Sequence, residues 1–221
     1  MQQNWIESLE PLMKQYDKRK HPLDYKSLYQ LVVMVILSAQ DSDKHINQLA
    51  PAFFGAYPTM NTLAKATTDD LYRYLSTVRN FGNKSGWLIK LAQIVGDDDN
   101  IPVTLTELTA LPGIGRKSAN VIIRESGSKA EGVIVDLHVV RVAPRIGLAS
   151  GTQPEKIEKQ IMGIVPQDRW NDIGMALSFL GREICRPTDP KCTVCIMNKV
   201  CSYYNGTANK SDRSTSDLTL F

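Results

Sequence analysis

Apolar residues recur every three or four positions over most of the chain, and strict alternation of apolar and polar residues is rare. This spacing gathers apolar side chains on one face of a helix, so it predicts an all-α protein. The His21-Pro22 pair predicts a break after the first helix. The predicted helices cover residues 1–16, 25–38, 43–54, 68–76, 84–95, 104–110, 116–125, 135–146, 154–165 and 170–184.

The segment 25–38 is apolar on every helical face rather than on one. A helix of this kind belongs in the centre of a core. A buried strand is the alternative, because a continuous apolar run does not by itself distinguish the two structures.

Length and composition exclude several classes of protein. The chain has 221 residues, of which 43% are hydrophobic and 22% are charged, a balance typical of globular proteins rather than disordered ones. Its longest apolar run covers only residues 31–37, whereas a membrane-spanning helix needs roughly 20 residues. The N-terminus shows no secretory signal, which favours the cytoplasm. The net charge of +3 permits nucleic acid as a partner without requiring it.

The sequence LPGIGRKSAN, residues 111–120, predicts a tight hairpin between two helices. Gly113 and Gly115 allow the chain to reverse and bring bare backbone close to a partner. The first N–H groups of the next helix then point into the same space, which suits a phosphate. Leu111 and Ile114 are expected to anchor the turn in the core. This pattern favours a helix-hairpin-helix that grips a nucleic-acid backbone, and a plain helical corner is the alternative.

Lys117 follows the hairpin directly, next to Arg116. A lysine in this position can simply pair with a phosphate. Partial burial near a second cation also lowers the pKa of a lysine amine, and such an amine can attack a sugar carbon and form a Schiff base.

The sequence VIVDLHV, residues 133–139, is a β-branched run that ends where a helix is predicted to start. Asp136 can cap that helix, or its carboxylate can stabilise a cationic transition state or activate a nucleophile. His138 lies at the same end, where it can contact a phosphate or satisfy a local backbone group.

All four cysteines lie within seventeen residues, spaced C-x6-C-x2-C-x5-C; they are Cys185, Cys192, Cys195 and Cys201. This clustering favours metal binding over disulfides. A tetrahedral zinc and a [4Fe–4S] cluster are both compatible with four thiolates. A zinc ribbon fits poorly, because only one close C-x2-C pair is present. Arg186, Lys191 and Lys199 give the site a basic edge.

These three motifs, in this order, resemble the endonuclease III family of base-excision DNA glycosylases. The resemblance covers roughly residues 20–204 and extends to Leu37-Ser38-Ala39-Gln40 followed by Asp43. It implies two all-α subdomains with DNA in the cleft between them. Residues 22–132 would form a six-helix barrel with the hairpin. Residues 1–21 and 133–204 would form the iron–sulfur subdomain, and residues 205–221 a flexible tail.

The resemblance also implies roles for individual residues. Lys117 matches the catalytic lysine, which displaces a damaged base, typically an oxidised pyrimidine, and then nicks the strand by β-elimination. Asp136 matches the essential aspartate. Gln40 matches the residue that fills the space left by the flipped base. The four cysteines match the ligands of a structural [4Fe–4S] cluster. The expected DNA contacts are Gln40, Asn80, Leu111, Gly113, Gly115, Arg116, His138 and Lys191.

Two positions depart from the family pattern. Leu137 stands where the family usually has threonine, directly after the aspartate. Asn80 falls near the family's apolar wedge, which enters the duplex from the opposite side. These changes leave the preferred lesion and the preferred opposite base open.

The chain ends in Leu218-Thr219-Leu220-Phe221 behind a polar, serine- and threonine-rich stretch that is predicted to be disordered. This ending resembles the peptide that bacterial replication proteins insert into a sliding clamp, with Leu218, Leu220 and Phe221 as the apolar anchors. Asp217 stands where glutamine is usual.

The leading hypothesis is therefore a bifunctional DNA glycosylase/AP lyase that works as a monomer in the cytoplasm, at the nucleoid. Related monofunctional glycosylases for uracil, alkylated or mismatched bases are the alternative among enzymes. A non-catalytic Fe–S DNA-binding protein and a zinc-bearing regulator are the alternatives from other classes.

Overall fold

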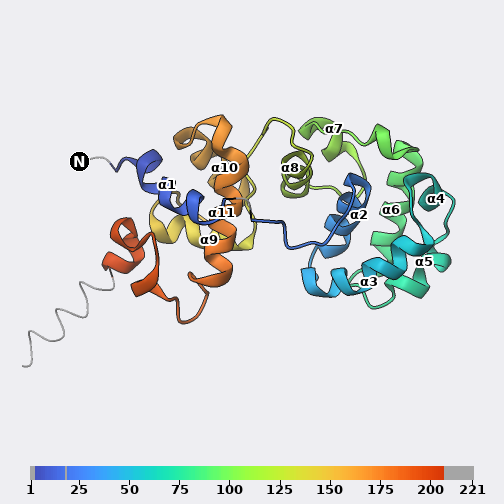
Figure 1. Ribbon diagram of the computed structural model, residues 1–221, viewed down its shortest axis with the longest axis horizontal. Coiled ribbons are helices and arrows are strands. Elements are labelled where there is room, and N and C mark those ends of the chain that lie inside the picture. The colour runs from blue at the N-terminus through green and yellow to red at the C-terminus, as the bar shows by residue number, and fades with distance from the viewer. Residues whose placement is uncertain (1–2, 18, 207–221) are drawn as a thin grey trace, which may run out of the picture. The chain divides into compact units, whose positions relative to one another are not determined.

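The computed structural model describes residues 3–17 and 19–206, and these contain helices but no strand. Four short 3-10 helices cover Asp98–Asn100, Gln167–Arg169, Cys192–Val194 and Asn198–Val200, and residues 202–206 are also helical. The α-helices, labelled in Figure 1 where there is room, are α1 (Trp5–Gln15), α2 (Leu28–Ser38), α3 (Asp43–Ala56), α4 (Met60–Ala64), α5 (Thr68–Leu75), α6 (Phe81–Val95), α7 (Leu105–Ala110), α8 (Arg116–Glu125), α9 (Leu137–Ile146), α10 (Pro154–Ile164) and α11 (Trp170–Glu183).

The predicted all-α class is confirmed, and so is the position of each predicted helix. The sequence analysis missed α4, whose five residues are too few to show a helical period. That helix depends on a capping box formed by Thr59 and Thr62. Helix α6 begins at Phe81, three residues before the predicted start, because Asn80 adopts a left-handed conformation and ends the preceding turn. Among the described residues, no helix is both long and apolar enough to cross a membrane.

The chain divides into two compact units. One unit comprises Met1–Arg19 together with Gly132–Phe221, and the other is Lys20–Glu131. The assignment of residues 22–132 to a DNA-gripping barrel and of 1–21 with 133–204 to a cluster subdomain stays a prediction. The same is true of a DNA cleft between them.

The unit Lys20–Glu131 is organised around α2 (Figure 1). Tyr29 and all seven residues 31–37 are buried, so this segment is a central helix and not the alternative strand. Helices α3, α6 and α8 pack against it. A helix buried all round leaves no polar face for solvent, and its ends must therefore carry the polar contacts. Ser27 supplies one such contact by accepting a hydrogen bond from the Gln30 N–H.

The other unit depends on close contact between α9 and α11, which pack more extensively than any other pair of helices. Helix α11 presents Gly174, Ser178 and Gly181 on one face, at helical spacing. A Cβ on Gly174 would lie 2.7 Å from the Ile134 carbonyl oxygen and 2.8 Å from its nitrogen, and one on Gly181 would lie 2.8 Å from the Cβ of His138. Only glycine at these two positions permits residues 134–142 to pack directly against α11.

Gly174→Ala should therefore destabilise the protein by about 3 kcal/mol, since the added methyl group meets backbone atoms that have no space to move. Gly163→Ala in α10 is the matched control, because nothing lies within 4 Å of the corresponding Cβ. The control should leave stability unchanged or raise it by up to about 1 kcal/mol. Urea unfolding of both variants measures the difference. Equal stability of the two variants would show that this contact is not tight.

Candidate functional site

The hairpin between α7 and α8 has the tight geometry that its glycines predict. Gly113 has a φ of +80°, a conformation that other residues rarely adopt. A Cβ there would also lie 3.1 Å from the Trp87 ring and 3.3 Å from Ile36. Leu111 and Ile114 are buried and anchor the turn, as expected. The backbone conformation and the close contacts thus both require glycine at position 113.

Helix α8 begins with two cations and no capping side chain. Gly115 is its N-cap residue and forms no side-chain cap, and the exposed side chains of Arg116 and Lys117 follow in the first turn. This first turn has no acidic residue. A helix N-terminus carries partial positive charge, so cations there are locally unfavourable. The arrangement becomes favourable when an anion binds to the N–H groups and the cations together.

A neutral histidine lies within electrostatic range of this turn. Burial lowers the pKa of His21 to about 4, and the charge of Lys117 acts in the same direction. The Nδ1 atom of His21 accepts a hydrogen bond from the Leu23 N–H at 3.1 Å. At neutral pH the imidazole is therefore uncharged and adds no positive charge near Lys117.

The carboxylate of Asp136 is held on both oxygens. Its Oδ1 accepts hydrogen bonds from the His138 and Val139 N–H groups, at 2.8 and 2.9 Å, and so caps α9. Its Oδ2 accepts a hydrogen bond from the Ser178 hydroxyl at 2.6 Å. The capping and functional readings of Asp136 are thus compatible, because the cap fixes the carboxylate at the start of the helix.

Ser178 was not among the site residues expected from sequence. It is fully buried, and it lies one helical turn beyond Gly174, where the backbone of residue 134 rests on α11. The spacing of Gly174, Ser178 and Gly181 was the available signal, because small residues repeated on one helix face mark a close contact. Only the tertiary structure shows which segment packs against these small residues.

The residues that follow Asp136 differ in exposure. Leu137 is 70% exposed although it is a large apolar residue next to a polar cap. His138 lies with its Nδ1 atom 3.2 Å from the Arg141 guanidinium. The guanidinium of Arg141 in turn donates hydrogen bonds to the carbonyl oxygens of Gly181 and Cys185. His138 therefore belongs to a group of contacts that joins α9 to α11 and to the first cysteine.

The four cysteines line one pocket of about 330 Å³, its open mouth included. Apolar side chains of Ile146, Leu180 and Ile184 form part of its wall, and Lys191 is also part of the lining. Burial raises the pKa of the Cys192 and Cys195 thiols, and the neighbouring cysteines act in the same direction. Over the described ranges, no group of three or more His, Cys, Asp or Glu residues is placed to hold a metal ion.

Helix α9 connects this pocket to Asp136. Its residue Arg145 donates hydrogen bonds to the carbonyl oxygens of Arg186 and Pro187, at 2.7 and 3.1 Å. The same guanidinium lies 3.7 Å from the Cys185 sulfur and 5.0 Å from the centre of the Tyr203 ring. The start of α9 thus carries the candidate catalytic carboxylate, and its end holds the chain around the first cysteine.

Gln40 and Asn80 come together at the surface of the unit Lys20–Glu131. Both are exposed, and both have left-handed backbone conformations, with φ values of +59° and +58°. The Asn80 amide nitrogen lies 3.5 Å from the Gln40 side-chain oxygen. The two expected DNA contacts from separate parts of the sequence therefore form one pair.

The expected site residues are divided between the two units. Gln40, Asn80 and the hairpin with Lys117 belong to Lys20–Glu131, and Asp136, His138 and the four cysteines belong to the other unit. Leu218, Leu220 and Phe221 lie outside the described residues.

Comparisons with known proteins show the family to which the chain is similar. A family model described as "HhH-GPD superfamily base excision DNA repair protein" matches residues 33–167. Endonuclease III of Rickettsia felis is 35% identical over 188 residues, which cover 84% of this chain and 88% of that protein. Endonuclease III of Synechocystis sp. is 33% identical over 192 residues, which cover 86% of this chain and 88% of that protein.

Solved structures are similar over most of the fold. One is a trapped endonuclease III–DNA covalent intermediate, with a TM-score of 0.82 and 27% identity over 91% of this chain and 96% of that one. Another is a non-covalent endonuclease III–DNA complex, with a TM-score of 0.82 and 28% identity over 91% of this chain and 95% of that one. The chain therefore belongs to the HhH-GPD superfamily of base excision DNA repair proteins and, within it, to the endonuclease III family.

Proposed function

We propose that this protein is a bifunctional DNA glycosylase/AP lyase that removes oxidised pyrimidines from double-stranded DNA. The observation that carries the proposal is Lys117, an exposed lysine in the uncapped first turn of α8, directly after the glycine hairpin. The similarity to a trapped endonuclease III–DNA covalent intermediate supports an enzyme that bonds covalently to DNA.

The reaction begins with a flipped nucleotide, because an enzyme cannot reach the sugar of a stacked base from outside the duplex. The neutral amine of Lys117 forms a bond to C1′ while the bond from C1′ to the base breaks, and the base leaves with that electron pair. The sugar ring then opens as a proton passes from the lysine nitrogen to the ring oxygen, which gives a protonated Schiff base.

Strand cleavage follows from the same intermediate. Removal of a proton from C2′ expels the 3′ phosphate and breaks the C3′–O bond. Water then hydrolyses the imine and releases Lys117 as an amine. The electron-withdrawing Schiff base acidifies the C2′ proton and so promotes this elimination. Because the same lysine also displaces the base, it serves both the glycosylase and the lyase activities.

Asp136 is proposed to stabilise the positive charge that develops on the sugar as the base leaves. A carboxylate has about four lone-pair positions, and the three hydrogen bonds of Asp136 leave capacity for a substrate contact. Because the helix cap and Ser178 fix its orientation, the carboxylate needs little reorganisation during the reaction.

Cys185, Cys192, Cys195 and Cys201 are proposed to hold a [4Fe–4S] cluster. Their shared pocket supports a single site for all four thiolates, and their spacing, with only one close C-x2-C pair, fits a zinc ribbon poorly. When bound, the cluster cross-links the loops that carry the cysteines and takes no part in bond breaking. Lys191 at the pocket is proposed to pair with a DNA phosphate.

Further contacts and partners belong to the same proposal. The hairpin, through Leu111, Gly113, Gly115 and Arg116, is proposed to grip the DNA backbone, and His138 to contact a phosphate. Leu218, Leu220 and Phe221 are proposed to dock on a sliding clamp. We infer that the protein acts as a monomer in the cytoplasm, at the nucleoid.

Lys117→Ala should abolish covalent trapping by borohydride, because no amine remains to form the imine. Duplexes that carry one thymine glycol or one abasic site are the substrates, and wild-type protein should give an adduct with both. Lys90→Ala, at an exposed lysine of the same unit, should trap normally. Continued trapping in Lys117→Ala would refute the assignment of Lys117 as the nucleophile. A wild-type adduct with the abasic duplex alone would refute an oxidised pyrimidine as the excised base.

Asp136→Asn should slow base removal by about a hundredfold or more, because an amide cannot stabilise the developing cation. Ser178→Ala should slow it by about tenfold, since it removes the hydrogen bond that orients Oδ2. Single-turnover rate constants on the thymine glycol duplex measure both effects. Ser150→Ala, an exposed serine in the same unit, should react at the wild-type rate. Wild-type rates in Asp136→Asn would exclude the assigned role.

Cys195→Ser should yield protein that lacks iron and the broad visible absorption of an iron–sulfur cluster, because a hydroxyl replaces one thiolate ligand. Asn198→Ala, which changes another residue of the pocket without removing a thiol, should keep both signals. Iron content and absorption spectra of the purified variants provide the test. Wild-type protein that contains zinc and is colourless would overturn the assignment of a [4Fe–4S] cluster.

A further inference from the structure

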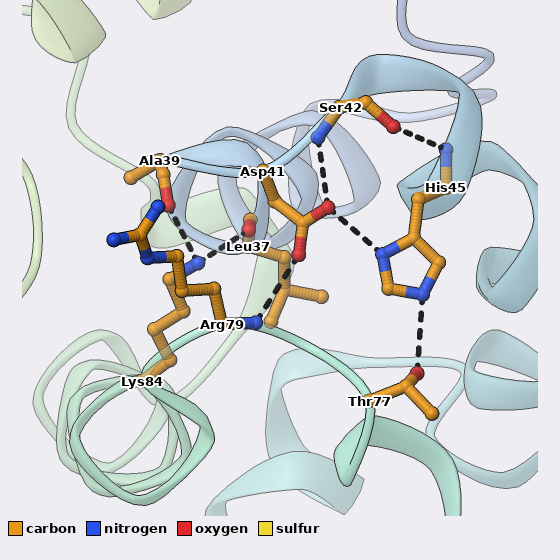
Figure 2. A network of polar contacts seen from close by, with 8 residues as sticks. All are labelled: Leu37, Ala39, Asp41, Ser42, His45, Thr77, Arg79 and Lys84. Carbon is orange, nitrogen blue, oxygen red and sulfur yellow. Dashed lines mark hydrogen bonds and ion pairs between the residues drawn. The ribbon is translucent and has the colours of Figure 1, made fainter.

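A second group of polar contacts joins two turns of the unit Lys20–Glu131, apart from the hairpin and the Asp136 cap (Figure 2). The first turn, residues 39–42, follows α2 and carries Gln40. The second turn, residues 77–80, precedes α6 and carries Asn80. These turns are nearly forty residues apart in sequence, so only tertiary contacts can fix the distance between Gln40 and Asn80.

Asp41 contacts both turns with one carboxylate (Figure 2). One oxygen accepts a hydrogen bond from the Ser42 N–H at 2.7 Å and lies 2.8 Å from Nδ1 of His45. The other oxygen accepts a hydrogen bond from the Arg79 N–H at 3.2 Å. The opposite ring nitrogen of His45 lies 3.1 Å from the Thr77 hydroxyl. The second turn is therefore attached to Asp41 directly and through His45.

The surroundings of Asp41 favour its charged form. Burial by itself raises the pKa of this carboxyl, but the hydrogen bonds from His45 and from the Arg79 and Ser42 N–H groups outweigh burial and lower it. Asp41 is thus ionised at neutral pH, and hydrogen bonds to an ionised acceptor are stronger than those between neutral groups.

Lys84 attaches the start of α6 to the end of α2. Its side chain is only 1% exposed, and its Nζ atom donates hydrogen bonds to the carbonyl oxygens of Leu37 and Ala39, both at 2.7 Å. Burial lowers the pKa of Lys84, whereas the charge of Asp41 acts in the opposite direction. A lysine at a helix C-terminus is favourable, because it satisfies carbonyl groups that have no partner within the helix.

These contacts act on two residues in uncommon backbone conformations. Gln40 and Asn80 both have positive φ. Asparagine adopts this conformation more readily than most residues, whereas for glutamine it is unfavourable and persists only where surrounding contacts enforce it. Gln40 lies between Ala39, which is bonded to Lys84, and Asp41. Asn80 directly follows Arg79, whose N–H is bonded to Asp41. The network therefore holds both turns at the residues next to the exposed amides.

We propose that Asp41 is a positioning residue that, together with His45 and Lys84, holds the amides of Gln40 and Asn80 as one rigid pair for insertion at a damaged base pair. The inference rests on the proposed function, because base extrusion leaves an unpaired base in the opposite strand. Carboxamides match the hydrogen-bonding groups on base edges. A fixed pair can occupy the opened site without first losing side-chain freedom.

This role predicts unequal effects on the two activities. Removal of a base from an intact pair requires extrusion, so it depends on the amide pair. An abasic site has no base to extrude, so strand cleavage there depends less on the pair. A general loss of folding would lower both rates by the same factor, which makes the ratio of the two rates the informative quantity.

Asp41→Ala should slow single-turnover removal of thymine glycol by about tenfold or more, and cleavage at an abasic site by less than about threefold. Asp41→Asn should restore part of the loss, because its side-chain oxygen can still accept a backbone hydrogen bond. Asp70→Ala is the matched control, since Asp70 also accepts a backbone N–H bond in this unit, from Thr67 at 2.8 Å. This control should leave both rates unchanged.

A double-mutant cycle tests whether Asp41 acts through the two amides. In a Gln40→Ala/Asn80→Ala background, the further change Asp41→Ala should leave base removal unchanged. A second loss of about tenfold in that background would overturn the proposal, and so would an equal fall of both rates in Asp41→Ala alone.

Binding provides a measurement that needs no catalysis. Wild-type protein should prefer a duplex with one thymine glycol on a 2′-fluoro sugar, which resists base removal, over an undamaged duplex, and Asp41→Ala should lose most of that preference. An unchanged preference would count against the positioning role. Failure of the wild-type protein to trap on any duplex would instead refute the proposed function, and the binding comparison would still decide the role of Asp41.

Discussion

The close approach of residues 134–142 to α11 is the constraint on which the unit with the cysteines depends. It exists because Gly174 and Gly181 have no side chain and because Ser178, between them, is small and polar. The same contact that packs the core therefore delivers a hydroxyl to Asp136. Helix α9 starts from that carboxylate and ends at Arg145, which holds the chain around Cys185. The packing of α9 on α11, the orientation of the Asp136 carboxylate and the cysteine pocket consequently depend on one another.

Charged side chains at helix ends either follow or oppose the helix dipole in this protein. Lys84 at the end of α2 and Asp136 at the start of α9 follow the helix dipole, and both also satisfy backbone groups. Arg116 and Lys117 oppose the dipole of α8, at an N-terminus that has no capping side chain. An N-terminus with two cations in its first turn favours the binding of an anion. In the proposed function, that anion is a phosphate of the DNA backbone.

The exposed amides of Gln40 and Asn80 show how distant parts of the sequence form a single feature. The local sequence of neither turn specifies that it lies beside the other. Asp41 and Lys84 hold the two turns together through hydrogen bonds to backbone groups, and His45 is bonded to the Asp41 carboxylate. The family resemblance predicts that Asn80 falls near an apolar wedge, and the side chain of this protein at that position is an amide.

The sequence by itself determined the helical class, the approximate bounds of ten α-helices, the hairpin and the clustering of the cysteines. These features depend on local periods, glycines and spacings, which act over a few residues and are visible without a structure. The left-handed conformation of Asn80 and the short helix α4 could not be predicted in this way. A single turn residue and a five-residue helix are too short to show a repeating pattern of apolar residues. Only the tertiary structure decided that Ser178 bonds Asp136, that Asp41 joins two turns and that Lys84 is buried at the end of α2. Each of these contacts joins residues nearly forty or more positions apart, and no local preference specifies which distant group will lie within hydrogen-bonding distance.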